Sequence, residues 1–334
     1  MATVLSGMRP TGRLHLGNYT GALESWVRGQ TQHRSFFMVA DLHALTTDLD
    51  TVAIAAQTRE MVIDWLAVGL DPERAPLFVQ SQVREHYELH LLFSMLVTLS
   101  RLERNPAVKE QVRALGLEET MTYGHLGYPI LQAADILLYK GDLVPVGEDQ
   151  APHVEITREI ARRFNLTFGP VFPEPKVEMT KFARFPGLDG QRMSKSQGNT
   201  LLLCDPPEDL RQRMRKAAID PKRVRQDDPG HPEDCTVFTY HQRFSAAEDL
   251  PEIERGCRAG ARVRSCLDCK MQAADRIAAH FAPARTARAE LETNPAYLDG
   301  VLESGRDRAR AVAAETMREV REAMGLGGMR KGTT

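Results

Sequence analysis

The chain has 334 residues, of which 42% are hydrophobic and 26% charged, so it is long enough to form two domains with cores of their own. Its formal net charge of −2 excludes a polycation that binds nucleic acid through overall charge, although 43 lysines and arginines leave room for local basic surfaces. The first apolar stretch, Ala2 to Leu5, is too short for a signal peptide, and no apolar run reaches membrane-spanning length. We therefore expect a cytoplasmic protein that does not bind membranes.

Short apolar runs alternate with amphipathic segments through the first half of the chain. The apolar runs predict strands at residues 3–7, 35–41, 75–81 and 143–147. Apolar residues that recur every three to four positions predict helices at residues 17–29, 52–69, 86–102, 128–139 and 148–165. This order predicts an α/β fold, in which a parallel sheet is covered on both faces and binds ligands at the carboxyl ends of its strands.

The pattern changes at about residue 186. A loop rich in Gly, Ser and Lys comes first, and the chain beyond "CDPPEDL" is mostly helical and rich in arginine. We therefore predict an α/β domain at residues 1–186, a mobile loop at 187–200 (the basic loop) and a helical domain at 201–334. The last helix is predicted at residues 294–326, and this division leaves room for it to pack back on the first domain.

The first strand and the first helix are joined by "GMRPTGRLHLGN", residues 7–18, which we call the glycine turn. Backbone N–H groups at a helix N-terminus favour anions, and Gly7 and Gly12 permit a tight turn beside a phosphate. Gly17 leaves space for a flat ring. His15 and Asn18 share one helix face, and both can donate hydrogen bonds to a phosphate or ribose oxygen. Taken alone, the turn fits a plain strand-to-helix connection equally well.

The basic loop contains "RMSKS", Arg192 to Ser196, with two cations and two hydroxyls between Gly190 and Gly198. An isolated loop of this kind is more often only solvated, but a mobile cationic loop can also close over a polyphosphate. "HLGN" after the first strand together with "MSKS" near the end of the sheet resembles the two signatures of class I aminoacyl-tRNA synthetases.

The resemblance extends over essentially the full chain. "SGMRPTGRLHLGNYTGAL", "DLHALT", "YPILQAADILLY", "LVPVGEDQAPHVEITREIARRFN" and "RMSKSQGNT" have the order and spacing of bacterial tryptophanyl-tRNA synthetases. That family implies a Rossmann-type catalytic domain, a helical anticodon-binding domain and a homodimer. It implies activation of tryptophan with ATP and Mg²⁺, followed by transfer to tRNA(Trp).

The resemblance also assigns the ATP site. His15, Asn18, Lys109 and Lys195 are the implied catalytic residues. The implied ATP contacts are Arg9, Gly17, Asn18, Gly147, Asp149, Arg192, Met193, Ser194, Lys195 and Ser196. Arg192 replaces the commoner lysine of the signature, and Arg9 stands where many relatives have glutamine. Asp149 fits a ribose hydroxyl or the substrate ammonium, and it also fits a helix N-terminal acid.

For tryptophan, the family assigns Asp135 to the indole N–H. Tyr128, Gln132 and Asp135 lie on one helix face by their spacing. The full implied set is Leu5, Gly7, His43, Tyr128, Gln132, Asp135, Val144, Val146 and Gln150. Asp135 would equally accept a tyrosine hydroxyl, so a tyrosyl ligase is the nearest alternative, and His43 is as consistent with a structural role. A nucleotidyltransferase of this fold or a non-catalytic RNA- or tryptophan-binding paralogue would not require all these motifs.

Four cysteines, Cys235, Cys257, Cys266 and Cys269, have the spacing C-x21-C-x8-C-x2-C. Four thiolates suit a [4Fe–4S] cluster or structural zinc, and unligated cysteines are the third alternative. Some bacterial tryptophanyl-tRNA synthetases carry a [4Fe–4S] cluster at a similar spacing in this domain, which favours iron. The neighbouring basic segments 211–225 and 258–264 suit tRNA phosphates or a solvated helix face.

Overall fold

The computed structural model describes residues 1–146, 151–179, 185–225, 227–260 and 262–326. At its centre lies a five-stranded sheet with the strand order β3-β2-β1-β4-β5, in which each described strand pair is parallel. The strands are β1 (Thr3–Met8), β2 (Arg34–Val39), β3 (Leu77–Val79), β4 (Leu143–Val146) and β5 (Lys176–Met179). The order reverses on the two sides of β1, so the carboxyl ends of β1 and β4 mark the place where such sheets bind ligands.

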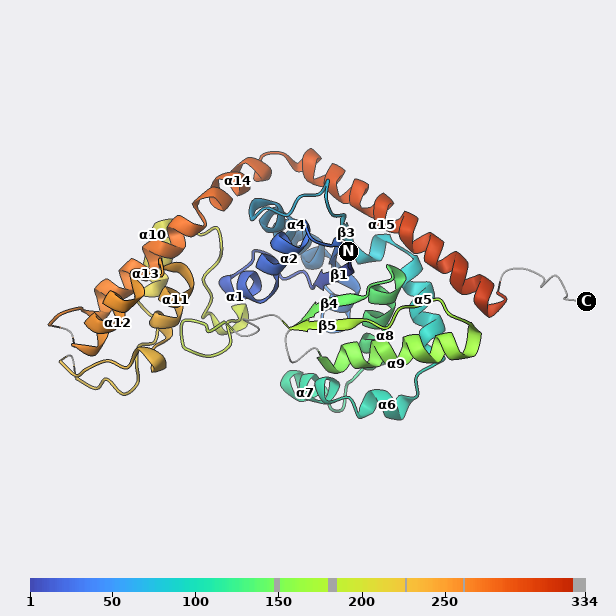
Figure 1. Cartoon of the computed structure of the whole chain (residues 1–334), viewed down its shortest axis with the longest axis horizontal. Coiled ribbons are helices and arrows are strands. Elements are labelled where there is room, and N and C mark those ends of the chain that lie inside the picture. Colours follow the sequence, from blue (N-terminus) through green and yellow to red (C-terminus); the bar gives the residue numbers. More distant parts are fainter. Residues whose placement is uncertain (147–150, 180–184, 226, 261, 327–334) are drawn as a thin grey trace, which may run out of the picture.

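Helices cover both faces of the sheet (Figure 1), which confirms the predicted α/β class. On one face, α2 (Glu24–Gly29) and α4 (Thr51–Ala67) share a core cluster with Phe37 of β2. On the other face, α5 (Glu85–Ser94), α8 (Tyr123–Leu138) and α9 (Ala151–Phe168) share a core cluster with Leu5 and Phe36. Side chains alternate between the two faces of a strand, so consecutive residues of β1 pack into the core clusters on opposite faces of the sheet.

Several predicted elements have different limits in the structure. The strand β5 was not predicted, because its four residues include only two apolar ones and it lies at the sheet edge. The helix predicted at 17–29 comprises α1 (Leu16–Asn18), a π-helical turn at Tyr19–Leu23 and α2. The helix predicted at 86–102 is divided into α5 and α6 (Leu99–Glu103), because Thr98 has extended backbone before α6. Two short helices, α3 (Asp41–Leu45) and α7 (Pro106–Leu115), were also not predicted.

The helices after the basic loop form a separate group beside the sheet, at the left of Figure 1. They are α10 (Pro207–Met214), α11 (Thr236–Phe244), α12 (Leu250–Arg258) and α13 (Cys266–His280). The next helix, α14 (Ala282–Glu292), leaves this group and contacts α4. It leads to the last helix, so the C-terminal part of the chain returns to the sheet.

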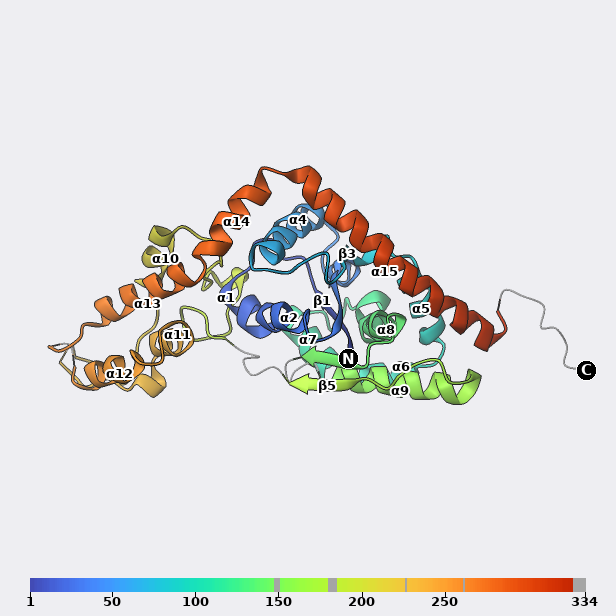
Figure 2. The same cartoon turned by 45° about the horizontal axis from the view of Figure 1, so that its top comes forward.

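The last helix, α15 (Pro295–Met324), runs along the edge of the sheet and contacts β3, α5 and α8 (Figure 2). The helix comes very close to β3 at Gly305, where a Cβ atom would lie 1.9 Å from the carbonyl oxygen of Leu77. A helix that lies this close to an edge strand covers backbone that would otherwise be open to pairing with another chain. None of the described helices is both long enough and apolar enough to cross a membrane.

Candidate active site

The glycine turn leaves the carboxyl end of β1 and enters α1 at His15. His15 Nδ1 accepts a hydrogen bond from the Asn18 backbone N–H (3.3 Å), and Asn18 Oδ1 accepts one from the His15 N–H (3.0 Å). Burial, with the nearby charges of Lys195 and Arg192, lowers the pKa of His15 to about 4. His15 is therefore neutral at physiological pH, and because Nδ1 accepts, its proton is on Nε2, which remains available as a donor.

The basic loop lies directly on the glycine turn. The Lys195 ammonium donates a hydrogen bond to the carbonyl of Thr11, and Lys195 Nζ would lie 3.7 Å from a Cβ on Gly12, whose φ is +73°. The backbone N–H of Gly17 points at the sulfur of Met193 (3.4 Å). A Cβ on Gly17 would lie 3.1 Å from the His15 ring, so only glycine fits between the ring and Met193 without displacing either.

The chain that follows the basic loop fixes this contact. Leu16 N–H donates to the Leu201 carbonyl, and Leu203 N–H donates to the Leu14 carbonyl, both at 2.9 Å, with His15 and Leu202 paired between them. Two segments far apart in the sequence therefore form one small surface at the carboxyl end of β1. The surface carries a neutral histidine and an ammonium group, which are donors suited to a polyphosphate, whereas the N–H groups at the start of α1 are already paired within the protein.

Asn199 organises the basic loop itself. Its Oδ1 accepts the Ser194 N–H (2.8 Å), and its Nδ2 donates to Asp189 Oδ1 (2.8 Å) and to the Arg192 carbonyl (3.0 Å). Asn199 is buried, whereas Arg192, Lys195 and Ser196 are exposed, and the hydroxyls of Ser194 and Ser196 lie 2.9 Å apart. Sequence reasoning did not single out Asn199, although its place directly after a glycine at the end of the loop was a usable signal.

Arg9, near the start of the glycine turn, contacts the end of α3, whereas the basic loop contacts later residues of the turn. Its guanidinium donates to the Thr47 hydroxyl and to the Ala44 carbonyl (3.4 Å), at the end of α3. Burial lowers the pKa of Arg9, and the nearby Asp48 and Tyr128 partly oppose that change. The structure thus brings Arg9 towards the residues predicted to bind tryptophan.

The residues predicted to line the indole site lie on the sheet face that α8 covers. Leu5 and Val144 are buried in the same core cluster as much of α8. Gly7 follows on the same face of β1 and is exposed. A Cβ on Gly7 would lie 3.1 Å from Met38 Cε, so the absence of a side chain at Gly7 lets Met38 pack closely against β1. The side chain of Val146 lies outside the described part, as do Gly147, Asp149 and Gln150.

Asp135 is the most constrained charged group on this face. Its Oδ2 accepts from His43 Nε2 (2.7 Å), while its Oδ1 accepts from His86 Nδ1 (2.7 Å) and Gln80 Nε2 (2.7 Å). Burial alone would raise the pKa of Asp135, but the hydrogen bonds from His43 and His86 bring it well below its usual range. Asp135 is therefore a buried carboxylate that stays ionised.

Two of these three donors, Gln80 and His86, were missed from the sequence. Both are fully buried, in spite of their polarity. The available signal was weak, because Gln80 ends an apolar strand and His86 begins a helix in which polar residues are frequent.

Three other predicted residues are Tyr128 and Gln132 of α8 and Lys109 of α7. The Tyr128 hydroxyl lies 2.7 Å from His153 Nε2, and Gln132 is half-buried one turn further along α8. Lys109 is exposed on α7, a helix that packs against α6 and α9. The structure therefore brings His15, Gly17, Asn18, Met193 and Lys195 together, and it does not place Lys109 beside them.

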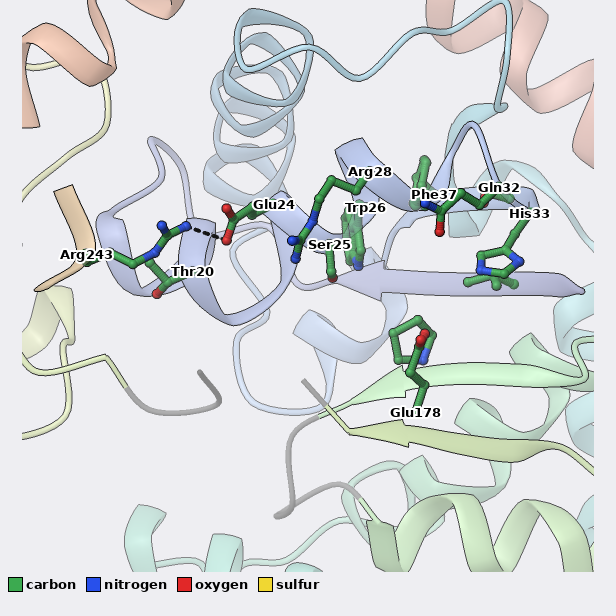
Figure 3. A pocket seen from close by; sticks show the side chains of 14 residues that line it. Thr20, Glu24, Ser25, Trp26, Arg28, Gln32, His33, Phe37, Glu178 and Arg243 are labelled. Carbon is green, nitrogen blue, oxygen red and sulfur yellow. Dashed lines mark ion pairs between the residues drawn. The ribbon is translucent and has the colours of Figure 1, made fainter. Parts of the chain in front are cut away.

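A pocket of about 440 Å³ lies on the other face of the sheet (Figure 3). Its lining includes Val4, Trp26 and Phe37, and an ion pair between Glu24 of α2 and Arg243 of α11 (2.5 Å) lies at its side. Because Val4 and Leu5 point to opposite faces of β1, this pocket is separate from the site around Asp135.

Of the four clustered cysteines, Cys235 directly precedes α11, Cys257 lies in α12, and Cys266 and Cys269 lie in α13; all are half-buried and free of disulfides. Burial, together with the neighbouring Cys235, Cys269 and Cys266, raises the pKa of Cys257 to about 11, so the four sulfurs are electrostatic neighbours. Within the described ranges, however, no three His, Cys, Asp or Glu side chains are arranged to hold a metal ion. Cys204 is buried elsewhere, at the end of the segment that pairs with the glycine turn.

The contact of the glycine turn after β1 with the basic loop is the arrangement that the two signatures of class I aminoacyl-tRNA synthetases predict. Residues 1–282 match the family described as tRNA synthetases class I (W and Y), and the chain belongs to that family.

Its similar relatives are tryptophan–tRNA ligases. The enzyme of Thermotoga maritima is 48% identical over 326 residues, covering 97% of this chain and 99% of the relative. The enzyme of Treponema pallidum is 47% identical and covers 98% and 97%, respectively. Among solved structures, tryptophanyl-tRNA synthetase from Campylobacter jejuni in complex with ADP and tryptophan matches with a TM-score of 0.87 at 31% identity, covering 97% of this chain and all of that one.

Proposed function

We propose that this chain is a tryptophan–tRNA ligase. It activates tryptophan with ATP to tryptophanyl-adenylate and pyrophosphate, and it then transfers tryptophan to the 3′ end of tRNA(Trp) with release of AMP. The observation that carries the proposal is the direct contact of Lys195 and Met193 with the glycine turn at the carboxyl end of β1. Near full-length identity of 48% to a tryptophan–tRNA ligase supports the choice of substrate.

In the first step, a carboxylate oxygen of tryptophan attacks the α-phosphorus of ATP, and the bond from that phosphorus to the bridging β-oxygen breaks. Negative charge then accumulates on the departing pyrophosphate, which leaves with Mg²⁺. Lys195 neutralises that charge, aided by the hydroxyls of Ser194 and Ser196 and by Arg192. His15 donates from Nε2 to a phosphate or ribose oxygen without adding a charge of its own, as its low pKa requires.

Asp135 supplies the selection for tryptophan. An ionised, buried carboxylate binds an indole N–H, and a substrate that lacks a donor leaves that charge without a partner. Leu5, Gly7 and Val144 contact the flat face of the indole, and Arg9, Tyr128 and Gln132 lie towards the amino-acid backbone of the substrate. Lys109, which is exposed on α7, is proposed to bind the phosphates.

Charging of tRNA tests this function. Purified enzyme, ATP and labelled tryptophan are incubated with transcripts of tRNA(Trp) or, as a control, tRNA(Tyr). We expect labelled tRNA(Trp) and no labelled tRNA(Tyr). Charging of tRNA(Tyr) with tyrosine, or no charging with either pair, would overturn the proposal.

We further propose that the enzyme works as a homodimer. An apolar row on α5 and α6 is exposed, with Tyr87 at 42%, Leu91 at 57%, Met95 at 68% and Leu99 at 60%. Contiguous exposed apolar side chains mark protein interfaces. In a two-fold symmetric dimer, this row on one copy would pack against the same row on the second copy. Light scattering should give twice the chain mass of 37.4 kDa, and Leu91→Glu should give monomer. A monomeric wild-type enzyme would contradict the dimer.

A [4Fe–4S] cluster is proposed at Cys235, Cys257, Cys266 and Cys269, with zinc as the alternative. The donor chemistry fits, because four soft thiolates bind iron or zinc and the cations Arg223, Arg264 and Lys270 offset their charge. Such a cluster would join the start of α11 to α12 and α13 and would hold together the helical group on which tRNA is proposed to bind. Anaerobically purified protein should contain iron and absorb broadly near 400 nm, and protein without iron or zinc would contradict the assignment.

We propose that tRNA binds the helical group near residues 211–225. The enzyme is proposed to act in the cytoplasm. Arg211 and Arg258 already pair with Asp275 and Glu254, whereas Arg215 and Lys216 lie exposed on the same segment. Exposed cations of this kind hold phosphates, and their removal should reduce the dependence of tRNA affinity on salt.

A further inference from the structure

We propose that His86 is the residue that positions Asp135 for tryptophan, and that it sets the preference for a substrate with an indole N–H. The inference rests on the proposed function. It concerns a side chain that does not reach the substrate and acts only through the carboxylate.

The two oxygens of Asp135 have different surroundings. Oδ1 faces the core, where the side chain of His86 is 0% exposed and Gln80 is also fully buried. Oδ2 faces His43, whose side chain is 13% exposed and lies at the open side of the site. The carboxylate is therefore anchored through one oxygen and presented through the other.

The number of hydrogen bonds leads to the same division. An ionised carboxylate accepts about four hydrogen bonds, two at each oxygen. Gln80 and His86 occupy both positions at Oδ1, and His43 occupies one position at Oδ2. One position at Oδ2 remains for a donor from the substrate.

His86 is held by a second contact of its own. The Tyr139 hydroxyl lies 3.0 Å from His86 Nε2. Burial raises the pKa of Tyr139 well above its usual value, so the phenol keeps its proton and can donate to Nε2. When Tyr139 donates to Nε2, the ring proton of His86 is on Nδ1 and points at Asp135, which makes an ordered chain of donors from Tyr139 through His86 to Oδ1.

Aromatic packing leaves the imidazole little freedom. The His86 ring lies 6.2 Å from the Phe78 ring and 5.6 Å from the Tyr139 ring, measured between centroids. These residues come from β3, α5 and the end of α8, so three elements fix one ring. A carboxylate oriented by a ring of this kind keeps a single rotamer, and Oδ2 stays aimed at the site.

The test compares two substrates that differ at a single group. Benzothienylalanine has sulfur in place of the indole N–H of tryptophan and is otherwise similar in shape. ATP–pyrophosphate exchange gives kcat/KM for each amino acid with wild type, His86→Leu, His86→Asn and Tyr139→Phe. Asn is chosen because its amide nitrogen lies where His86 Nδ1 lies, so it keeps the donor to Oδ1.

We expect wild type to prefer tryptophan strongly. In His86→Leu, kcat/KM for tryptophan should fall by about 10- to 100-fold, as for other groups that orient a ligand-binding side chain, while that for benzothienylalanine changes by less than about 3-fold. His86→Asn should recover most of the preference, and Tyr139→Phe should show an intermediate loss. The KM for ATP should stay constant in all four proteins.

Equal losses for both amino acids in His86→Leu, without recovery in His86→Asn, would assign His86 a structural role only and overturn the proposal. If His86→Leu fails to fold, His86→Asn and Tyr139→Phe test the proposal without it. An unchanged preference for tryptophan over benzothienylalanine in Tyr139→Phe would then overturn the role of His86. A wild type that activates tryptophan and benzothienylalanine equally would refute the role of Asp135, whereas a wild type that activates neither would refute the proposed function.

Discussion

Replacement of Arg288 by methionine tests how the helical part of the chain supports the glycine turn. Arg288 of α14 is 4% exposed and pairs with Asp64 of α4 at 2.6 Å, where Asp64 is 1% exposed. The other oxygen of Asp64 accepts the backbone N–H of Leu14 at 2.5 Å, next to His15. The guanidinium therefore neutralises a buried carboxylate that holds the glycine turn.

The magnitude follows from burial. Removal of one partner from a buried ion pair costs about 3–5 kcal/mol, because the other charge remains in the core. Arg288 also contacts Glu60 and Glu292, but these carboxylates are 42% and 50% exposed, so they add at most about 1 kcal/mol each. We expect the free energy of unfolding to fall by about 3–5 kcal/mol in Arg288→Met.

The loss should depend on pH. Burial raises the pKa of Asp64, and Arg288 opposes that rise. Without Arg288 the folded-state pKa rises further above the unfolded value, so the cost of burying the charge appears as the pH increases through it. Urea unfolding should therefore give a larger destabilisation at about pH 8 than at about pH 5.5.

Two further variants control this experiment. Arg276→Met removes an exposed arginine that pairs with Asp249, and it should cost about 1 kcal/mol or less. Arg288→Met combined with Asp64→Asn removes both buried charges and should recover a large part of the loss. A loss in Arg288→Met no larger than that in Arg276→Met, or no recovery in the double variant, would refute the reasoning.

Two other predictions concern contacts on the sheet edge and in the basic loop. Thermal melts should show that Gly305→Ala lowers the free energy of unfolding by about 1–3 kcal/mol or more, because the new Cβ meets the Leu77 carbonyl. The control is Gly300→Ala, whose Cβ meets nothing within 4 Å and which should raise the free energy of unfolding by up to about 1 kcal/mol. Asn199→Asp keeps the acceptor for Ser194 but places a carboxylate against Asp189, so kcat/KM for ATP should fall by about 10- to 100-fold with little change in the KM for tryptophan. An unchanged ATP dependence in pyrophosphate exchange would contradict the role of Asn199.

The sequence predicted the architecture well because its signals were local. Four of the five strands and the long last helix follow from apolar runs and helical periodicity, and the contact of the glycine turn with the basic loop was anticipated from two short motifs. The edge strand β5 was missed because Lys176–Met179 has too few apolar residues to stand out. The division of helix 86–102 was missed because the backbone at Thr98 depends on tertiary packing.

The site was predicted less completely for a related reason. Asp135 was found through its motif, but its donors Gln80 and His86 come from separate elements whose meeting no local pattern reveals. Arg288 was missed in the same way, since its partner Asp64 lies 224 residues away in the sequence, whereas the partners of Asn199 lie within ten residues and only the fold of the loop brings them together. Buried polar networks are properties of the packed fold, and single-residue patterns report them poorly.

We propose that the glycine turn and the basic loop form one ATP site in which Asp135 selects tryptophan. ATP–pyrophosphate exchange with a panel of amino acids, in wild type and in Asp135→Asn, tests it most directly. We predict exchange with tryptophan alone in wild type, and a loss of about 100-fold or more in kcat/KM for tryptophan in Asp135→Asn, because the amide carries no charge and also presents its own N–H groups. Exchange with tyrosine in wild type, or normal exchange with tryptophan in Asp135→Asn, would contradict the account.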